Sequence, residues 1–342
     1  MLGNSIKIIL LSLLIFATTL NAKDYTKQKN TRLFINMMVK KYHFNKTYLN
    51  RLFKNVKFQK GALGMFNPAY RKKTKKVKHY PKHGSWDRYE KILLGRTRVL
   101  KGVEYIHKYR KIFKKVYQKY GVEPEYIAAI IGVESYYGHN RGKFPVFDVL
   151  TTLAFEPNRR AKYFRYELKQ FLLLSKSEKF NPKDVKGSYA GAIGLGQFMP
   201  SAYKPFAVDF NRDGKRSMQT TSDAIAGIAN YFKKNGWKKG QPVAVRVSYK
   251  GNRFNAKRTG YKHKYSRVHL KGIVPKNGKW IYNGKVRLIK LDRYKYDELW
   301  YGAKNFFVIT RYNHSSYYAM AIHQLAQKIK AEYKKRYNSL PR

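Results

Sequence analysis

Apolar residues fill one stretch of this chain almost without interruption. From Pro124 to Gly138 the sequence reads PEYIAAIIGVESYYG, and isoleucine, alanine or valine occupies most positions up to Val133. Pro124 suits the first position of a helix, and Gly138 suits the residue just past its end. The pattern predicts a helix with almost no polar face, which is expected to be buried.

Periodic apolar positions predict further helices along the chain. Helical spacing recurs within residues 23–60, throughout 86–118, on both sides of a turn at 156–158 within 146–174, in 223–235 and in 317–336. Residues 61–83 are rich in lysine, proline and tyrosine and read as a loop. The end of this loop, KKTKKVKHYPKH, is either a solvated segment or a dedicated site for a polyanion.

The pattern changes to alternation from Pro242 onward. Positions 243, 245 and 247 are valines, and a second β-prone run, 281–291, contains the pair Asn283-Gly284. Such an Asn-Gly pair between β-formers predicts a hairpin turn. We therefore expect a small antiparallel β-rich subdomain before the last helix, within an α+β fold that is mainly α.

The composition adds a strong positive charge. The 342 residues include 73 Lys and Arg against 19 Asp and Glu, which gives a formal net charge of +54. Such a charge attracts polyanions, among them nucleic acid, anionic lipid and anionic cell-wall polymers. Hydrophobic residues make up 43% of the chain, which favours a globular fold over a disordered one.

The N-terminus helps to choose among these partners. Lys7 precedes the apolar run 8–17, and Leu20-Asn21-Ala22 offers a small residue before a cleavage point. Residues 1–22 are therefore expected to form a secretory signal peptide, with an uncleaved anchor as the alternative. The chain has no cysteine, so we expect neither a disulfide nor a lipoprotein anchor. Export to the periplasm makes nucleic acid an unexpected partner.

One carboxylate interrupts the apolar helix near its end. Glu134 follows Val133 and precedes Ser135, Tyr136 and Tyr137. A buried carboxyl group without a partner raises its pKa and keeps its proton. A protonated glutamic acid in an aromatic-lined cleft is what a glycosidase needs to protonate a leaving sugar oxygen. The alternative is a structural role, in which Glu134 is bonded to a nearby arginine or tyrosine.

A calcium-loop pattern follows in DFNRDGKRSMQTTSD. Asp209, Asn211 and Asp213 alternate as oxygen ligands before a turn at Gly214, as in the first half of an EF-hand loop. Thr220 stands where the closing Glu is expected, and Asp223 is the candidate to replace it. Basic residues within the loop would weaken cation binding. The alternative is an Asp/Gly-rich turn without a metal.

The glycine-rich segment GSYAGAIGLGQFMPS, residues 187–201, is a third candidate. Its glycines allow close approach of the backbone, either to a packed neighbour or to a substrate. The sequence contains no His-Glu-x-x-His pattern, phosphate loop or dinucleotide fingerprint. We expect no organic cofactor.

These segments together resemble a known family. IGVESYYG, TLAFEPNRRAKYFRYEL, GSYAGAIGLGQFMPS, AVDFNRDGK, DAIAGIANYF and WYGAKNFFVITRYNHSSYYAM, in this order, are similar to the membrane-bound lytic murein transglycosylase B family. The resemblance runs from about Trp86 to Leu325 and implies a lysozyme-like core with an inserted β subdomain. The expected organisation is 1–22 signal peptide, 23–85 basic N-terminal helical region and loop, 86–241 catalytic core with the calcium loop, 242–299 β-rich subdomain, and 300–342 a C-terminal segment returning to the core.

The resemblance also implies the chemistry. Glu134 becomes the single acid/base that cleaves the bond between N-acetylmuramic acid and N-acetylglucosamine in peptidoglycan. The acetamido group of the muramic acid would stabilise the cation, and a 1,6-anhydromuramic acid end would form without water. Substrate-assisted enzymes of this kind are an exception to the two-carboxylate rule of glycosidases.

Further site residues carry over position by position. Arg159 and Arg160 match paired arginines suited to stem-peptide or lactyl carboxylates. The other matching positions would bind sugar through polar groups or aromatic rings: Tyr89, Ser188, Gln197, Tyr231, Tyr312, Asn313 and Tyr318. Asp209, Asn211, Asp213 and Asp223 match the family's calcium loop. A structural role remains the alternative for each of these residues.

The expected protein is thus a monomeric, periplasmic lytic transglycosylase with a structural Ca²⁺. Its partners would be peptidoglycan strands with their stem peptides, together with cell-wall synthesis or division proteins. One alternative is a hydrolytic muramidase that passes the intermediate to water. Another is a catalytically silent, basic protein that binds the cell wall.

Overall fold

The computed structural model of the protein describes residues 22–71, 80–251, 254, 256–278 and 280–342. The chain forms two compact units, Met1–Gln59 and Lys60–Arg342. Residues 1–21 of the expected signal peptide, and 72–79 of the basic segment KKTKKVKHYPKH, lie outside the described residues. Among the residues described, no helix is both long enough and apolar enough to cross a membrane.

The smaller unit contains two helices and a short strand pair. Helices α1 (Lys29–Tyr42) and α2 (Lys46–Lys54) pack against each other, and β1 (Ala22–Lys23) pairs antiparallel with β2 (Val56–Lys57). The Asn45 side chain accepts a hydrogen bond from the Tyr48 amide at 2.8 Å, and it thereby caps the start of α2. Buried aromatic rings of Tyr25, Phe34 and Phe53 form its core. The helical spacing read within 23–60, at positions 33–39, falls in α1.

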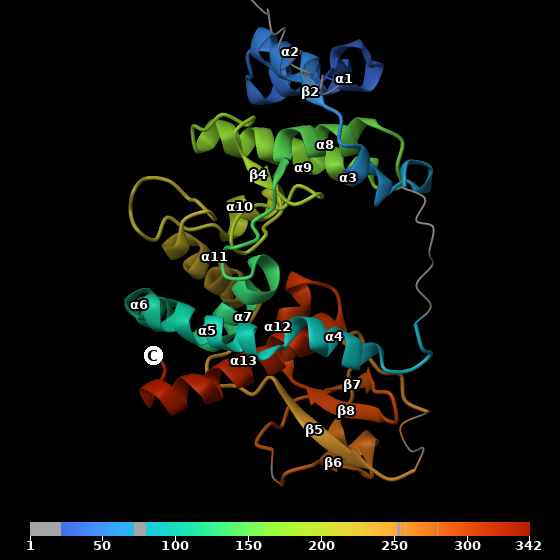
Figure 1. Ribbon diagram of the computed structural model, residues 1–342, viewed down its shortest axis with the longest axis vertical. Coiled ribbons are helices and arrows are strands. Elements are labelled where there is room, and N and C mark those ends of the chain that lie inside the picture. Colours follow the sequence, from blue (N-terminus) through green and yellow to red (C-terminus); the bar gives the residue numbers. More distant parts are fainter. Residues whose placement is uncertain (1–21, 72–79, 252–253, 255, 279) are drawn as a thin grey trace, which may run out of the picture. The chain divides into compact units, whose positions relative to one another are not determined.

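The larger unit is built on helices. They are α3 (Lys60–Gly64), α4 (Ser85–Leu93), α5 (Arg96–Lys108), α6 (Arg110–Tyr120), α7 (Pro124–Ser135), α8 (Val146–Phe155), α9 (Ala161–Ser177), α10 (Pro200–Phe206), α11 (Thr221–Lys234), α12 (Lys304–Tyr312) and α13 (Ser316–Tyr337). Helix α7 contacts α5, α6, α11 and α13, so its apolar surface is enclosed on several sides (Figure 1). The predicted buried helix is therefore the centre of this unit.

A turn between two helices follows from one asparagine. The Asn158 amide group donates to the carbonyl of Leu153 at 2.8 Å and to that of Glu156 at 2.9 Å. Its side-chain oxygen accepts from the Arg160 amide at 2.9 Å. These bonds end α8 and begin α9, as the turn predicted at 156–158 requires.

The antiparallel sheet lies near the end of the chain. Its strands β5 (Ala244–Tyr249), β6 (Ile273–Pro275), β7 (Arg287–Asp292) and β8 (Asp297–Gly302) are ordered β6-β5-β8-β7 (Figure 1). Alternate side chains build a separate core that includes Val247, Leu288 and Tyr301. A further two-stranded pair, β3 (Phe144–Pro145) with β4 (Lys186–Gly187), lies outside this sheet.

Two local expectations were wrong. The segment 61–83, read as a loop, contains the end of α3 and a 3₁₀ turn at Pro68–Tyr70. The hairpin turn is not at Asn283-Gly284 but at 293–296, between β7 and β8, whose register pairs Asp292 with Asp297. Ile281, before the Asn-Gly pair, is 90% exposed, so no strand forms there to complete the predicted hairpin.

Candidate active site

Glu134 lies in the last turn of α7, where the helix ends abruptly. Tyr136 and Tyr137 follow with φ of 50° and 57°, in the left-handed region that non-glycine residues rarely adopt. Gly138 continues the turn with φ of 93°. The amides of Gly138 and Asn140 donate to the Ser135 carbonyl at 3.0 and 2.8 Å, so the reversed chain closes the helix end.

The Tyr137 side chain accounts for this conformation. Its hydroxyl donates to the Arg98 carbonyl on α5 at 2.9 Å. A Cβ atom placed on Gly102 of α5 or on Gly132 of α7 would lie 2.5 Å from the same hydroxyl oxygen. Only glycine at these two helical positions leaves room for the ring. The packing of Tyr137 thus offsets the backbone strain and fixes where Glu134 stands.

Aromatic hydroxyls surround the Glu134 carboxyl group. Tyr318 of α13 donates to Glu134 Oε1 at 2.6 Å. Burial is the main cause that raises the pKa values of Tyr318, of Tyr89 on α4 and of Tyr312 on α12, and the nearby charge of Glu134 is the second cause. Side chains from three helices therefore face one carboxyl group that remains partly exposed.

Burial gives Glu134 an unusual acidity. It raises the pKa of Glu134 to about 7, although the hydrogen bond from Tyr318 acts in the opposite direction. Such a group is half protonated near neutral pH, and it can both give and take a proton. Neither cause of this shift is a second carboxylate.

The glycine-rich segment holds this end of α7. The Ser135 hydroxyl donates to the Leu195 carbonyl at 2.8 Å, and the Tyr312 hydroxyl donates to the Gly196 carbonyl. A Cβ atom on Gly196 would lie 2.8 Å from the Tyr312 hydroxyl oxygen. The glycines of 187–201 thus permit close packing beside Glu134, so the packed-neighbour alternative applies at Gly196.

The other predicted residues near this segment have backbone partners. Gln197 donates its amide to the carbonyls of Arg141 and Gly194, at 3.1 and 2.9 Å. The Ser188 hydroxyl accepts from two amides of its own turn. Tyr231 donates to the Arg311 carbonyl at 2.6 Å, and its ring lies 5.0 Å from that of Tyr312. The structure thus brings Tyr231 next to Tyr312, whereas the Gln197 side chain is bonded to backbone carbonyls.

Three predicted residues are exposed. Asn313 ends α12, and Arg159 and Arg160 precede α9. The Arg160 guanidinium lies 4.2 Å from the centre of the Tyr163 ring, a cation–π contact that orients it. No contact in the described part of the chain joins the arginines to Glu134, so the structure does not gather them with it.

The predicted calcium loop is a tight turn. Asp209 accepts hydrogen bonds from the amides of Asp213 and Gly214, at 3.1 and 2.9 Å, and Asn211 donates to Asp213 at 2.8 Å. The oxygen-bearing side chains therefore lie on one turn, as cation binding requires. No group of three or more His, Cys, Asp or Glu side chains suited to a metal occurs within the described residues.

Asp223 has a different position from the other three residues. It is fully buried at the start of α11 and accepts from the Phe210 amide at 2.9 Å and the Ser217 amide at 3.0 Å. Each carboxylate oxygen is thus bonded to the backbone on one side of the loop. Asp223 thus closes the loop from the start of α11 and lies apart from Asp209, Asn211 and Asp213, which share the exposed turn.

Sequence reasoning missed two residues of this site. Ser135 and Tyr137 were noted only as neighbours of Glu134, yet they anchor the helix end to the glycine-rich segment and to α5. The one available signal is a pair of glycines, Gly102 and Gly132, inside predicted helices, where glycine usually marks close packing.

Comparisons with known proteins identify relatives of this chain. The family model described as the transglycosylase SLT domain matches residues 26–327. Membrane-bound lytic murein transglycosylase B of Escherichia coli K12 is 39% identical over 308 residues, which cover 90% of this chain and 84% of that protein.

Solved structures extend the comparison. The E. coli lytic transglycosylase SLT35 in complex with bulgecin A is 38% identical, with a TM-score of 0.83 over 91% of this chain and 96% of that one; the same enzyme has been solved with calcium. SltB3 from Pseudomonas aeruginosa in complex with NAG-anhNAM-pentapeptide is 26% identical, with a TM-score of 0.73 over 88% and 78% of the chains.

The likeness to SLT35 confirms the expected fold, which is lysozyme-like, mainly helical and supplemented by small antiparallel sheets. It extends over nearly the whole of both chains, so it is not a likeness of a shared fragment. The family model also matches most of the chain. This chain belongs to the transglycosylase SLT domain family and is a lytic transglycosylase.

Proposed function

We propose that Glu134 is the single acid/base of a reaction that cleaves the β-1,4 bond between N-acetylmuramic acid and N-acetylglucosamine in peptidoglycan. The observation that carries this proposal is the Glu134 carboxyl group. Burial raises its pKa to about 7, and among the described residues Tyr318 is its one hydrogen-bond partner. The structures solved for relatives, with bulgecin A and with NAG-anhNAM-pentapeptide, support a glycan substrate.

The reaction follows from one carboxyl group. Protonated Glu134 gives its proton to the glycosidic oxygen as the bond from that oxygen to C1 of the muramic acid breaks. The acetamido group of the same sugar stabilises the positive charge at C1. Ionised Glu134 then takes the proton of the C6 hydroxyl as its oxygen bonds to C1. The product is a 1,6-anhydromuramic acid end, Glu134 regains its proton, and no water is consumed.

Other residues would bind the substrate. Tyr89, Tyr231, Tyr312 and Tyr318 offer aromatic faces for sugar rings, while Ser188, Gln197 and Asn313 offer polar groups. The exposed Arg159 and Arg160 suit carboxylates of the stem peptides, because guanidinium groups bind carboxylates through paired hydrogen bonds.

Asp209, Asn211 and Asp213 would supply oxygen ligands to a calcium ion, which would stabilise the loop between α10 and α11. This assignment rests on their common turn and on the calcium bound by SLT35. Calcium has no part in the glycosidic chemistry. No organic cofactor is needed for that chemistry either, because every proton moves through Glu134.

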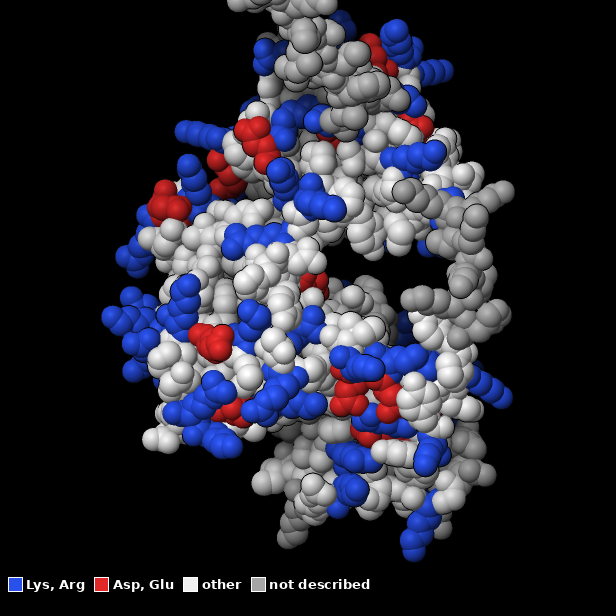
Figure 2. Space-filling view, in the orientation of Figure 1, with Lys and Arg blue, Asp and Glu red and all other residues white. Residues whose placement is uncertain are grey.

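The enzyme is proposed to act as a monomer in the periplasm, where peptidoglycan lies. The export signal read in residues 1–22 supports this location. Lysine and arginine side chains cover much of the visible surface (Figure 2), and they would attract the acidic stem peptides and other wall polyanions. Cell-wall synthesis or division proteins are the macromolecular partners that such an enzyme would serve.

A digest of purified peptidoglycan tests the proposed reaction. Soluble products are weighed by mass spectrometry before and after treatment with borohydride. Products one water lighter than hydrolytic ones, and resistant to reduction, are expected. Reducing ends would instead assign a hydrolytic muramidase to the same site, and binding without products would indicate a silent wall-binding protein.

A further inference from the structure

The tip of the β7–β8 hairpin rests on the first turn of α4. The Tyr294 amide donates to Asp87 Oδ2 at 3.0 Å. The Tyr294 ring covers Gly84, where a Cβ atom would lie 2.3 Å from the ring. Gly84 has φ of 83°, so this position favours glycine both for its conformation and for the space available. The hairpin tip is thus fitted to the start of this helix.

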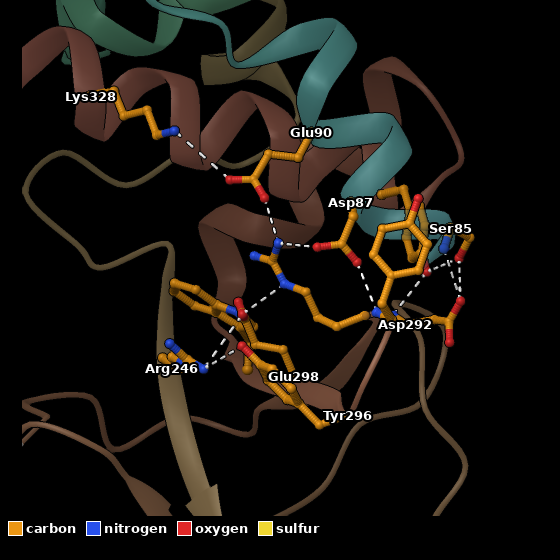
Figure 3. Close-up of polar contacts among 12 residues, drawn as sticks. Ser85, Asp87, Glu90, Arg246, Asp292, Tyr296, Glu298 and Lys328 are labelled. Carbon is orange, nitrogen blue, oxygen red and sulfur yellow. Dashed lines mark hydrogen bonds and ion pairs between the residues drawn. The ribbon is translucent and has the colours of Figure 1, made fainter. Parts of the chain in front are cut away.

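An arginine at the hairpin tip joins three carboxylates from two elements (Figure 3). Arg293 Nη1 lies 2.9 Å from Asp87 Oδ1 and 2.5 Å from Glu90 Oε2, both on α4. Its Nε lies 3.1 Å from Glu298 Oε2 on β8. The Arg293 side chain is only 17% exposed, so these ion pairs are partly shielded from solvent and fix the strand pair to the helix.

Asp292 caps α4 from outside the helix. Helix α4 begins after Gly84, which has no side chain to cap it. Asp292 Oδ2 accepts the Ser85 amide at 3.0 Å and the Ser85 hydroxyl at 2.8 Å (Figure 3). A carboxylate at a helix N-terminus satisfies free amides and suits the helix dipole. Burial opposes ionisation, but hydrogen bonds from Ser85 and His83 lower the pKa of Asp292 to about 2, so the cap stays charged.

The same contacts continue toward Glu134 through Tyr317. The Tyr317 hydroxyl accepts from the Asp292 amide at 3.1 Å and lies 2.8 Å from the Ser85 hydroxyl. Because that hydroxyl donates to Asp292, Tyr317 donates to Ser85. The Tyr317 ring packs 5.8 Å from the ring of Tyr89. The next residue along α13 is Tyr318, which donates to Glu134.

We propose that Asp292 is a positioning residue for glycan cleavage: by fixing Ser85 and Tyr317, it holds Tyr89 and Tyr318 against Glu134. The proposal rests on the role of Glu134 put forward above. Its consequence is that the end of β7 at Asp292 supports the site around Glu134, so the sheet is more than an appended wall-binding module. Small displacements at a catalytic group cost rate steeply, which is why such support matters.

The register of the hairpin supplies a matched control. Asp297 stands opposite Asp292 on β8, and its carboxylate pairs with Lys290 at 3.2 Å on the same hairpin. Asp292→Asn and Asp297→Asn thus each remove one negative charge, and the two changed residues face each other across the hairpin. On a soluble glycan strand of defined length, we expect Asp292→Asn to lower kcat about tenfold with KM changed less than about twofold. Asp297→Asn should leave both constants unchanged.

A double-mutant cycle tests whether Asp292 acts on the site through its contact with Tyr317. Tyr317→Phe removes only a hydroxyl group and should lower kcat to a similar extent. If both residues act through one contact, the double variant Asp292→Asn/Tyr317→Phe should lose little more than either single variant. Equal kcat for the two aspartate variants, a change confined to KM, or additive losses would overturn the proposal. An unchanged kcat in Tyr317→Phe would also overturn the proposal, even if the Asp292 variant did not fold.

Glu134→Gln separates this proposal from the proposed function. If Glu134→Gln retains cleavage, the assignment of the acid/base fails. If Glu134→Gln is inactive while Asp292→Asn behaves like Asp297→Asn, only the positioning role fails.

Discussion

Glu134 and Asp223 are carboxylates set among apolar helices, one at the end of α7 and the other at the start of α11. Asp223 has both oxygens bonded to backbone amides, whereas within the described part of the chain Glu134 accepts a single bond, from the Tyr318 hydroxyl. Two backbone donors satisfy both oxygens of Asp223 and tie the loop to the start of α11. One donor in a buried setting leaves a carboxyl that can exchange its proton. The partners, more than the burial, separate the structural acid Asp223 from Glu134, the acid/base that we propose.

The largest effect should come from removing the exchangeable proton. Glu134→Gln keeps the shape of the side chain, and we expect it to lower glycan cleavage by about 10³-fold, the usual contribution of general acid/base catalysis. Glu125→Gln is the matched control, because Glu125 lies on the same helix, is fully buried at its other end and pairs with Arg342 at 2.7 Å. Release of muropeptides measures both variants, and equal activity would abolish the distinction between Glu134 and other buried acids.

Removing the structural acid should instead reduce stability. Asp223→Ala leaves the amides of Phe210 and Ser217 without partners, and we expect the free energy of unfolding to fall by about 3 kcal/mol. Asp213→Ala, at an exposed position of the same loop, should reduce the free energy of unfolding far less than Asp223→Ala does. Urea unfolding monitored by circular dichroism compares the two. Similar losses would mean that Asp223 is no more than one loop residue among several.

The stability of the Glu134→Gln variant relative to the wild type should depend on pH. The folded-state pKa of Glu134, about 7, exceeds its ordinary value of 4.5, so the folded state binds this proton more tightly than the unfolded state. Wild-type stability should therefore fall as pH rises from 4.5 through 7, and the variant escapes that loss because a glutamine side chain cannot ionise. The variant should gain on the order of 2 kcal/mol over the wild type between about pH 5 and pH 8. Thermal unfolding at both pH values tests this, and a constant difference would argue against a raised pKa.

Tyr318→Phe tests the role of the hydrogen bond from the Tyr318 hydroxyl to Glu134. The bond from Tyr318 favours the ionised carboxylate, so its loss should raise the pKa of Glu134 and move the basic limb of the pH–rate profile to higher pH. We expect kcat to fall about fivefold, as for one lost hydrogen bond. Tyr89→Phe, which removes a hydroxyl facing the same group, should leave that limb in place. A limb that moves equally in both variants would mean that Tyr318 has no special part.

The smallest effect concerns the calcium loop. Calcium at millimolar concentration should raise the melting temperature by about 2 °C, because a ligand that binds only the folded state stabilises it. Asn211→Ala should abolish the rise. Identical melting curves with calcium and with chelator would mean that the loop is a turn held by its own hydrogen bonds, without a metal.

Local patterns predicted the elements around the site well. The proline and the apolar run identified α7 and its burial, because a helix without a polar face has to be enclosed. The asparagine turn between α8 and α9 is likewise a local matter, since its three hydrogen bonds lie within eight residues. Where the stabilising contacts lie within a few residues of one another, the sequence is sufficient to predict the local structure.

The hairpin was misplaced for a different reason. Asn-Gly at 283–284 has the right turn chemistry, but the strand that should precede it does not form, and the turn at 293–296 is held by ion pairs from α4. Those partners, Asp87 and Glu90, lie 206 and 203 residues away from Arg293 in sequence. Tertiary contacts with α4, and not the local Asn-Gly signal, therefore determine where the hairpin turn forms.

The site itself combines both kinds of information. Glu134 was found from its setting in an apolar helix, whereas the involvement of Tyr89, Tyr312 and Tyr318 came only from family resemblance. Their meeting depends on how α4, α12 and α13 pack against α7, which no pattern within the segments contains. The contacts of Asp292 with Ser85 and Tyr317 were not predicted at all, for the same reason.

The most direct test of the account is a titration of the Glu134 carboxyl group. Carbon-detected NMR of protein labelled at glutamate side chains follows the resonance of each carboxyl group from about pH 3 to pH 9. The resonance that is missing from the spectrum of Glu134→Gln is assigned to Glu134. A midpoint near pH 7 is predicted, the value at which one group can serve as both acid and base. A midpoint near the ordinary glutamate value of 4.5 would contradict the account, because Glu134 would then carry no proton to give at neutral pH.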